Sequence, residues 1–587
     1  MTLPVLFLVP ARGGSVRVPG KNLRSVAGIP LVAHGVRIAR AAAARTPSGP
    51  HAVVCSTDDP AIAAVAREWH AEIPFERPAA LAGPDASSVD VALHALETLA
   101  ARGRRYRAVV LVQPTSPLAD PGDVAAAVAA LDADGAPVTS VVAAHPASWH
   151  VALDADRRLR PVDGDARHLL AGAFYAIAPG ELATARAFVV PGRTRGLEVA
   201  AATAVDIDTE DDLAVARALA AARPVPPVAV AGRSIGDGPC FVIAEGGVNH
   251  DGDPALAHRL VDAAADAGAD AVKFQAFDPA LLAAAGAPLA DYQRAAGETG
   301  ADQRAMLARL ALPVEAWPGL RDHARDRGLV FLASPFDEPS ADLLEALGIP
   351  AFKVGSGELT NLPFLERLAG VGRPLLVSTG MATLVEVADA LEAIAGSGDP
   401  PVALLHCVSA YPADPAEANL RAIATLRAAF GRPSGWSDHT PGIELPTAAA
   451  ALGADLLEKH LTLDRSLPGP DHRASLEPAE MAALVRAVRT VEAARGDGEK
   501  RPSAAELAVA AVARKSLHWA RALPAGAAVT PADLVALRPG TGLRPGERRL
   551  VVGRRTRRPV PAGSLVTLAD VEDGVEGDVG AGVEPPA

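Results

Sequence analysis

Short apolar runs at regular spacing constrain the carboxyl-terminal half of this chain more than any other feature. Eight runs of two to five residues lie between residues 241 and 457, with helix-forming stretches between them. They are Phe241–Ala244, Ala271–Val272, Leu329–Ala333, Ala351–Phe352, Leu375–Val377, Val402–Leu405, Gly435–Trp436 and Leu456–Leu457. The pattern predicts an α/β fold, a (β/α)₈ TIM barrel, for which about 250 residues are typical.

A polar or ionisable side chain follows each run. In order these are Glu245, Lys273 with Gln275, Ser334, Lys353, Ser378 with Thr379, His406, Ser437-Asp438-His439 and Glu458-Lys459-His460. Barrel enzymes build their active sites at the carboxyl ends of the strands. Ordinary loop residues are the alternative, but eight polar strand ends in succession favour an active site.

Composition excludes several classes of protein. The formal charge of −13 argues against nucleic acid or an anionic membrane as a partner. Three widely separated cysteines, without metal-ligand spacing, fit a reducing cytoplasm. No apolar run approaches the roughly 20 residues of a membrane span, and the first residues resemble a buried strand rather than a signal peptide. We therefore expect a soluble, cytoplasmic enzyme.

A chain of 587 residues exceeds one hydrophobic core, and the sequence predicts several domains. Residues 1–221 alternate strand-like and helical runs, which predicts a Rossmann-like, parallel α/β sheet. Its expected strands are Val5–Pro10, Ala52–Ser56, Ala108–Gln113 and Val138–Ala143. We expect a linker at 222–239, the barrel at 240–498, a small, mostly β domain at 503–572 and a disordered tail at 573–587.

The segment PARGGSVRVPGKN near the amino terminus has the character of a phosphate-binding loop. Gly13 and Gly14 allow backbone N–H groups to approach phosphate oxygens, while Arg12 and Lys21 supply positive charge. A Gly-Gly loop alone is weak evidence. Here it precedes the segments STDD, ERPAALAGPDASS, QPTSPL and VDIDTEDDL.

Together these segments resemble the CMP-sialic acid synthetases (acylneuraminate cytidylyltransferases), over about residues 3–220. The resemblance implies that CTP contacts Arg12, Gly13, Gly14, Ser15, Lys21, Asn22, Arg77, Ser88 and Gln113. It also implies a Mg²⁺ site at Asp206 and Asp208, whose i, i+2 spacing on a strand would place both carboxylates on one side. A solvated acidic strand end is the alternative for this pair alone.

Three departures from that family concern the sugar-facing residues. Val16-Arg17 replaces the usual Lys-Gly, Ala119 replaces an arginine, and Ala171-Gly172-Ala173 replaces Asn-Gly-Ala. These departures imply either a sugar other than N-acetylneuraminate or a domain that has lost its activity.

Within the predicted barrel, Lys273 and Lys353 with nearby serines predict an anion cradle for a phosphorylated substrate. His439 and His460 end neighbouring strands, and two converging imidazoles suit a divalent metal that polarises a carbonyl. A lone histidine is more often structural, and His250 and His406 fit that alternative.

The order of motifs resembles the sialic acid synthases, which condense phosphoenolpyruvate with an N-acylated hexosamine. The motifs include AEGGVNHDG, VKFQ, FKVGSGELTNLP, STGMATL, LLHCVSAYP, WSDHT and EKHLTLDRSLPGPDH. The resemblance implies Mn²⁺ or Mg²⁺ on His439 and His460. It places phosphoenolpyruvate on Lys273, Ser334, Lys353, Ser356, Ser378 and Ser437, and the amino sugar on Glu245, Tyr411, Glu458 and Asp471. Glu245, the two lysines and the two histidines would be the catalytic residues.

The segment RKSLHWARALPAGAAVTPADLVALRPGTGL resembles the antifreeze-like SAF (β-clip) module of the same synthases. That resemblance implies a homodimer with swapped SAF domains, in which Arg538 contacts the N-acyl group of the sugar. A solvated arginine in a turn is the alternative for this residue.

The sequence thus predicts a bifunctional enzyme that makes a nonulosonic acid and then activates it with CTP. N-acetylmannosamine, giving N-acetylneuraminate, and 2,4-diacetamido-2,4,6-trideoxymannose, giving legionaminate, both stay open as substrates. The competing hypothesis is an active synthase whose amino-terminal domain is only a nucleotide-binding scaffold.

Overall fold

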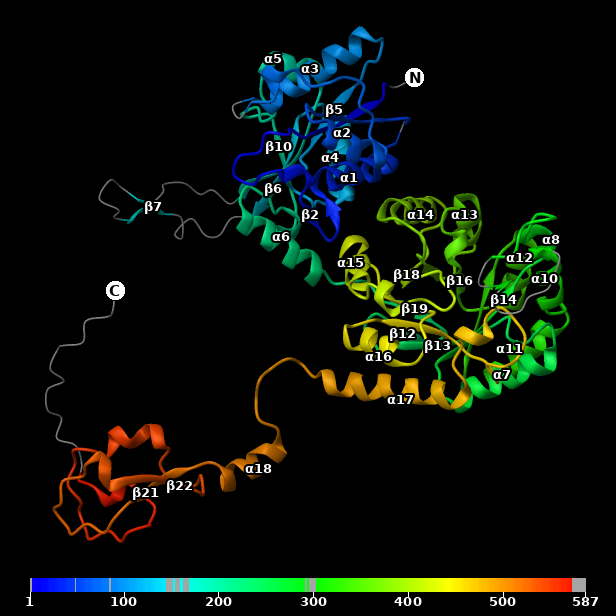
Figure 1. Cartoon of the computed structure of the whole chain (residues 1–587). Helices are drawn as coiled ribbons and strands as arrows, with labels where there is room; N and C mark the ends of the chain where they lie inside the picture. The colour runs from blue at the N-terminus through cyan, green and yellow to red at the C-terminus, as the bar shows by residue number, and fades with distance from the viewer. Residues whose placement is uncertain are drawn as a thin grey trace. The chain divides into compact units, whose positions relative to one another are not determined.

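The computed structural model describes residues 3–47, 49–83, 86–143, 151–153, 159–161, 168–290, 293–294 and 302–572. It divides into two compact units, Met1–Arg495 and Gly496–Ala587 (Figure 1). The tail predicted to be disordered, residues 573–587, lies outside the described residues.

The predicted barrel is confirmed. Eight parallel strands close on themselves, with the last pairing with the first. They are β13 (Phe241–Gly247), β14 (Ala271–Ala276), β15 (Val330–Pro335), β16 (Phe352–Val354), β17 (Leu375–Ser378), β18 (Val402–Cys407), β19 (Ser434–Asp438) and β20 (Leu456–His460). Each predicted apolar run overlaps one of these strands.

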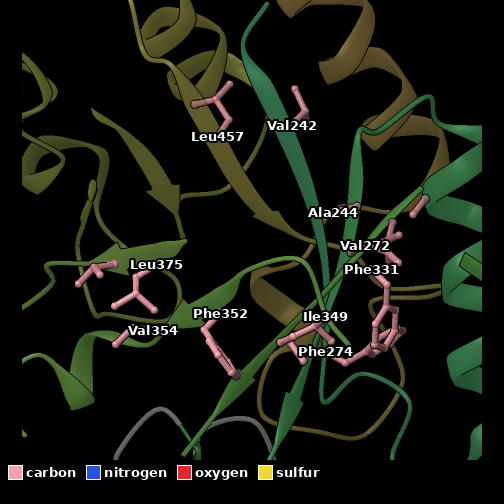
Figure 2. Close-up of a cluster of buried hydrophobic side chains, with 14 of the residues drawn as sticks. Val242, Ala244, Val272, Phe274, Phe331, Ile349, Phe352, Val354, Leu375 and Leu457 are labelled. Atoms are coloured by element: carbon pink, nitrogen blue, oxygen red, sulfur yellow. The ribbon is translucent and has the colours of Figure 1, made fainter. Parts of the chain in front are cut away.

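Helices cover the outside of the barrel. They are α7 (Pro254–Asp266), α8 (Pro279–Leu282), α10 (Gln303–Leu310), α11 (Ala316–Asp326), α12 (Glu338–Leu347), α13 (Leu362–Gly370), α14 (Leu384–Gly396), α15 (Arg421–Phe430), α16 (Glu444–Ala451) and α17 (Pro478–Arg495). Several begin at side-chain caps, such as Asp253 for α7 and Thr383 for α14. Alternate strand residues, including Val242, Val272 and Phe331, point outward and form the buried layer beneath these helices (Figure 2).

The segment predicted as a linker contributes to the barrel core. Residues 222–239 contain an antiparallel hairpin, β11 (Val228–Val230) and β12 (Arg233–Ile235). Its apolar side chains join the cluster formed inside the barrel by residues such as Phe241, Val330 and Leu456, which begin their strands. The hairpin therefore packs against the amino-terminal end of the barrel and leaves the carboxyl end for a site.

The amino-terminal sheet has the strand order β10-β6-β9-β5-β1-β4. These strands are β1 (Val5–Pro10), β4 (Ala52–Ser56), β5 (Ala108–Val112), β6 (Val138–Ala143), β9 (His168–Ile177) and β10 (Arg195–Glu198). A two-stranded hairpin, β2 (Ser25–Val26) and β3 (Ile29–Pro30), accompanies them. The helices are α1 (Leu31–Arg45), α2 (Pro60–Glu68), α3 (Ser88–Ala101), α4 (Pro121–Asp134), α5 (Pro179–Ala185) and α6 (Glu210–Ala222).

The four predicted strands, β1, β4, β5 and β6, all run parallel to one another, as expected, and the sheet contains in addition an antiparallel strand, β9, that was not predicted. β9 runs antiparallel to both β5 and β6, whereas β1 is parallel to β4 and β5. Parallel neighbours need a crossover connection, usually a helix. The described residues between β6 and β9 instead form a short hairpin, β7 (Val151–Leu153) and β8 (Leu159–Pro161).

The second unit is small. It contains α18 (Ala504–Ala513) and the antiparallel pair β21 (Ser516–Trp519) and β22 (Leu534–Leu537). Isolated bridges such as Leu523–Val560 extend the β pairing around a core that includes the buried Trp519. Among the helices that the structure describes in either unit, none has both the length and the apolarity needed to cross a bilayer.

Gly435 allows a close approach of two barrel strands. A methyl group at this position on β19 would overlap the carbonyl oxygen of Leu456 on β20. We expect Gly435→Ala to lower the free energy of unfolding by about 3 kcal/mol or more, at the upper end for overpacking. Gly396→Ala is the control, since nothing lies within 4 Å of a methyl group there, and should change it by less than about 0.5 kcal/mol. Equal urea midpoints for the two variants would contradict this packing.

Candidate active sites

The carboxyl ends of the barrel strands surround a cavity of about 370 Å³. The barrel residues to which the synthase resemblance assigns a substrate or a metal all line it: Glu245, Lys273, Ser334, Lys353, Ser356, Ser378, Tyr411, Ser437, His439, Glu458, His460 and Asp471. Of the other polar strand ends, Gln275 also lines it, whereas Thr379, His406, Asp438 and Lys459 are not among the lining residues. The structure therefore brings these residues together, while the role of each one stays a prediction. Arg538 is exposed and belongs to the second unit, so its contact with a sugar also stays a prediction.

Two lysines and two glutamates form a buried ionic network in this cavity. Lys273 Nζ lies 2.8 Å from Glu245 Oε1 and 3.0 Å from Glu458 Oε2, and the three side chains are at most 4% exposed. Lys353 Nζ lies 3.3 Å from Glu458 Oε1 and donates to Ser378 Oγ at 2.7 Å. Each buried charge thus has a partner, as burial in a low-dielectric interior requires.

The two lysines differ electrostatically. Burial lowers the pKa of Lys273, but Glu245 and Glu458 together outweigh it and raise that pKa above its ordinary value. For Lys353, burial outweighs the attraction of Glu458, so its pKa falls below the ordinary value. Burial alone would raise the pKa of Glu245, yet His460, Lys273 and Lys353 hold it well below its usual range. Glu245 is therefore ionised at neutral pH.

Hydroxyl groups complete the polar lining near the lysines. Ser334 Oγ is buried and has no hydrogen-bond partner among the described residues. Ser356 Oγ accepts the N–H of Gly380 at 3.0 Å, and Ser437 Oγ donates to Glu458 at 2.8 Å. An unpartnered buried hydroxyl in the same cavity as two ammonium groups suits the oxygens of an anion.

His439 and His460 face one another with ring centres 5.3 Å apart. His439 Nδ1 lies 2.8 Å from the carbonyl oxygen of Val408, so an N–H there leaves the Nε2 lone pair free. His460 Nδ1 is buried without a hydrogen-bond partner, 3.8 Å from Asp471 Oδ2. Two imidazoles, each with an uncommitted nitrogen, fit a divalent metal whose remaining ligands are water or substrate oxygens.

Cys407 adds a charge-sensitive contact to this pair. Its Sγ lies 3.8 Å from His439 Nδ1. Burial lowers the pKa of His439, but Cys407 and the carbonyl of Val408 raise it to about 9. A metal that binds here must displace that proton. Among the residues described, no group of three or more His, Cys, Asp or Glu is arranged to hold a metal by itself.

Sequence reasoning missed Cys407 as a lining residue and gave no role to Gln275, and strand alternation places both side chains in the cavity. Gln275 lies two positions after Lys273 on β14, and its Nε2 donates to Glu245 Oε1 at 3.1 Å. On β18, Cys407 lines the cavity, while the preceding His406 turns outward against Trp436 and bonds the carbonyl of Ala418 at 3.0 Å. His406 is thus held as a structural residue.

A second cavity, of about 540 Å³, lies in the amino-terminal domain. Its lining includes most of the residues predicted to contact CTP: Arg12, Ser15, Lys21, Asn22, Arg77, Ser88 and Gln113. Asp208 and Arg17 also line it. Positive groups therefore gather around a cavity at the carboxyl ends of β1 and β5, where α/β sheets bind ligands.

Gly13 and Gly14 are not among the lining residues. The N–H of Gly13 donates to Asp58 Oδ1 at 3.1 Å, and a methyl group on Gly13 would lie 2.7 Å from Asp59 Oδ2. The structure thus explains why a glycine stands at position 13: the STDD segment approaches it closely. The N–H of Gly13 is not free to bind a phosphate.

Asp206 and Asp208 lie on an extended loop rather than the predicted strand. Ile207 between them is buried and its N–H donates to Thr115 O at 2.8 Å, so both carboxylates are on the exposed side. Asp208 lies 3.1 Å from Lys21 Nζ and 3.3 Å from Arg17 Nη1. Asp206 is not a lining residue of the cavity. The carboxylates still offer exposed oxygen ligands suited to Mg²⁺.

Fold and sites define this chain as a barrel enzyme joined to a nucleotidyltransferase-type domain. Family models match in three regions: the NeuB family at residues 260–500, a cytidylyltransferase at residues 6–168 and a SAF domain at residues 514–572. The chain therefore belongs to the NeuB family and carries a cytidylyltransferase domain before it and a SAF domain after it.

Individual relatives agree with this assignment. The chain is 44% identical over 337 residues to N,N'-diacetyllegionaminic acid synthase of Legionella pneumophila. The match covers 57% of this chain and 95% of that protein. It is 39% identical over 298 residues to mouse N-acetylneuraminate-9-phosphate synthase, covering 50% of this chain and 82% of the relative. The crystal structure of N-acetylneuraminic acid synthetase from Leptospira borgpetersenii is 35% identical, with a TM-score of 0.43, and covers 49% of this chain and 95% of its own.

The buried network predicts a pH-dependent loss of stability when Lys273 is removed. In Lys273→Met, the pKa of Glu245 rises from its wild-type value, because burial is then opposed only by His460 and Lys353. Stability that ionised Glu245 contributes in the wild type is therefore lost at pH 7, and this penalty shrinks as the pH falls through the raised pKa of Glu245. We expect a loss of about 3 kcal/mol at pH 7 and less at pH 5, by urea unfolding. Lys500→Met is the control, because Lys500 is exposed. A loss of unfolding free energy in Lys273→Met that grows as the pH falls would contradict the network.

Proposed function

We propose that this chain is a bifunctional enzyme of nonulosonic acid biosynthesis. Its barrel condenses phosphoenolpyruvate with an N-acylated hexosamine, and its amino-terminal domain transfers CMP from CTP to the resulting acid. The observation that carries the proposal is one cavity that is lined both by two buried lysines and by two buried histidines. The cytidylyltransferase family match supports the second activity.

In the synthase, the anionic substrate would lie against Lys273 and Lys353. Ser334, with its unpartnered hydroxyl, would donate to its phosphate or carboxylate oxygens, and Ser356, Ser378 and Ser437 line the same part of the site. His439 and His460 would hold Mn²⁺ or Mg²⁺, which when bound polarises the aldehyde of the open-chain sugar. Tyr411, Glu458 and Asp471 line the space left for that sugar.

The bond changes follow from this placement. Carbon 3 of the enol attacks the aldehyde carbon, whose oxygen takes up a proton, and water adds at carbon 2. Glu245, which is ionised and lies at the same cavity, accepts the proton of that water. Phosphate then leaves by cleavage of its C–O bond. Fixing both substrates beside one another supplies much of the rate, because it removes the entropic cost of their encounter.

For the sugar, we propose 2,4-diacetamido-2,4,6-trideoxymannose, with legionaminate as product, ahead of N-acetylmannosamine. Identity to two N,N'-diacetyllegionaminic acid synthases is 44% and 42%, against 39% for the mouse N-acetylneuraminate-9-phosphate synthase. The departures at Val16, Ala119 and Ala171 in the amino-terminal domain agree with a sugar other than N-acetylneuraminate. A substrate panel with phosphoenolpyruvate, read by mass spectrometry, decides between them.

In the transferase, CTP would lie against Arg12, Lys21 and Arg77, with Mg²⁺ on Asp206 and Asp208. The anomeric hydroxyl of the sugar acid attacks the α-phosphorus, and pyrophosphate leaves. The competing function, a nucleotide-binding scaffold, gains weight from Asp208, which lies within ion-pair distance of Arg17 and Lys21. Pyrophosphate release from CTP in the presence of either nonulosonate supports the transferase over the scaffold.

The two activities should separate by mutation. We expect His439→Ala and His460→Ala to reduce phosphate release from phosphoenolpyruvate by at least about a thousandfold, because the carbonyl is no longer polarised. Both variants should retain pyrophosphate release from CTP, and Lys21→Ala should show the converse. Loss of both activities in one variant with wild-type circular dichroism would argue against two independent sites.

We also propose a cytoplasmic homodimer in which each SAF domain covers the barrel of its partner and Arg538 contacts the N-acyl group. We expect Arg538→Ala and His439→Ala variants, each inactive as synthases, to regain activity when co-expressed. In a swapped mixed dimer one of the two barrels keeps its histidine and receives an intact arginine, so we expect about half of wild-type activity per mixed dimer and about a quarter averaged over a randomly mixed population. Failure of purified mixed dimers to regain activity would exclude swapping.

A further inference from the structure

A third cavity, of about 580 Å³, lies between the amino-terminal domain and the barrel, within the first unit. One wall comes from α1 and the end of α6, and the other from α14 and α15. The same interface is packed, because Val385 and Ala429 of the barrel belong to one buried cluster with Val32 and Val36 of α1. The cavity is thus a part of a formed interface.

Positive charge predominates in this cavity. Five arginines line it, against three carboxylates: Arg37, Arg40, Arg45, Arg223 and Arg432 against Asp120, Glu392 and Asp399. The chain as a whole has a formal charge of −13, so the cavity reverses the sign of the surrounding protein. A local excess of cations in an acidic protein attracts anions selectively to that place.

The carboxylates of the cavity already have partners. Glu392 lies 2.9 Å from Arg40, which also pairs with Asp389 at 3.1 Å. Asp399 lies 3.7 Å from Arg432. Asp120 accepts the N–H of Gly122 at 2.6 Å as the N-cap of α4. Among the described residues, none of the three forms an ion pair with Arg37, Arg45 or Arg223.

Arg37 and Arg223 have no ion-pair partner among the carboxylates that the structure describes. Arg37 donates through Nη1 to the carbonyl of Ala429 at 2.7 Å, and its guanidinium lies 5.9 Å from the centre of the Phe430 ring. A methyl group on Gly431 would lie 3.7 Å from Arg223 Nε, so Arg223 also lies at the end of α15. Burial and the charge of Arg223 lower the pKa of Arg37 to about 10.

Part of this arrangement has a structural explanation. The carboxyl end of a helix carries partial negative charge, which favours a guanidinium at the end of α15. The hydrogen bond to Ala429 uses one of the five N–H donors of Arg37. The like charges of Arg37 and Arg223 are left without a negatively charged partner among the described residues. A bound anion would relieve their repulsion and use the remaining donors.

We propose that this cavity binds a phosphorylated small molecule between the guanidinium groups of Arg37 and Arg223. The planar fork of arginine matches phosphate oxygens in pairs. Because both domains wall the cavity, a ligand there stabilises their docking. The inference rests on the cavity alone and does not require the proposed function.

Isothermal titration of the full chain tests this site with fructose 1,6-bisphosphate and with inorganic phosphate. The background carries Lys21→Ala and Lys353→Ala, which weaken anion binding at the two candidate active sites. We expect Arg37→Gln with Arg223→Gln to weaken binding of fructose 1,6-bisphosphate by at least about tenfold. The matched control, Arg67→Gln with Arg102→Gln, removes two exposed arginines outside the cavity and should change affinity by less than about twofold.

If the double variant does not fold, the single variant Arg223→Gln replaces it, because Arg223 is exposed and its substitution should leave the fold intact. We expect this single variant to weaken binding of fructose 1,6-bisphosphate by at least about threefold. Preference for the bisphosphate identifies an organic phosphate, and equal affinity identifies free phosphate. Either result supports the proposal only if the arginine variants bind the ligand more weakly than the background chain. Binding that survives Arg37→Gln with Arg223→Gln, or no binding up to about 10 mM in the background chain, overturns the proposal while leaving both enzymatic activities open.

Discussion

The structure of the barrel site depends on burying two lysines and two glutamates within one polar network. Isolated charges at this depth would be far too costly, so each ammonium group must lie beside a carboxylate. The strand register achieves this. Glu245 on β13 is level with Lys273 on β14 and with His460 on β20. A slip of one residue in any of these strands would turn its polar side chain away from the cavity.

The apolar layers fix that register. Outward-facing residues such as Phe274 and Leu457 pack beneath the helices, and inward-facing residues such as Ile243 and Leu456 pack with the β11–β12 hairpin at the amino-terminal end. The interior is thus apolar where the strands begin and polar where they end. Gly435 allows β19 and β20 to approach closely. His439 directly follows β19, and His460 is the last residue of β20.

This division explains which features could be predicted from the sequence. The eight strands and their polar ends follow from a repeated local pattern, and alternation distinguishes Cys407, which lines the cavity, from His406, which does not. The antiparallel direction of β9 and the role of the β11–β12 hairpin depend on contacts with distant segments, for which the local pattern carries no signal. Gly13 shows the same limit, because its close neighbour is Asp59 and not a ligand.

The two candidate sites hold their charges in different ways, and this sets how each recognises an anion. In the barrel, Glu245 and Lys273 are at most 4% exposed, so their mutual attraction is strong and the site is organised before substrate arrives. In the amino-terminal domain, Asp208 is 54% exposed and its pairs with Arg17 and Lys21 are weakened by solvent and salt. Arg17 is 73% exposed and forms the weaker pair, whereas Lys21 is 15% exposed and also donates to the carbonyl of Ile207 at 2.8 Å. The buried site gains its selectivity from fixed geometry, whereas the exposed site must gain it from the ligands that complete it.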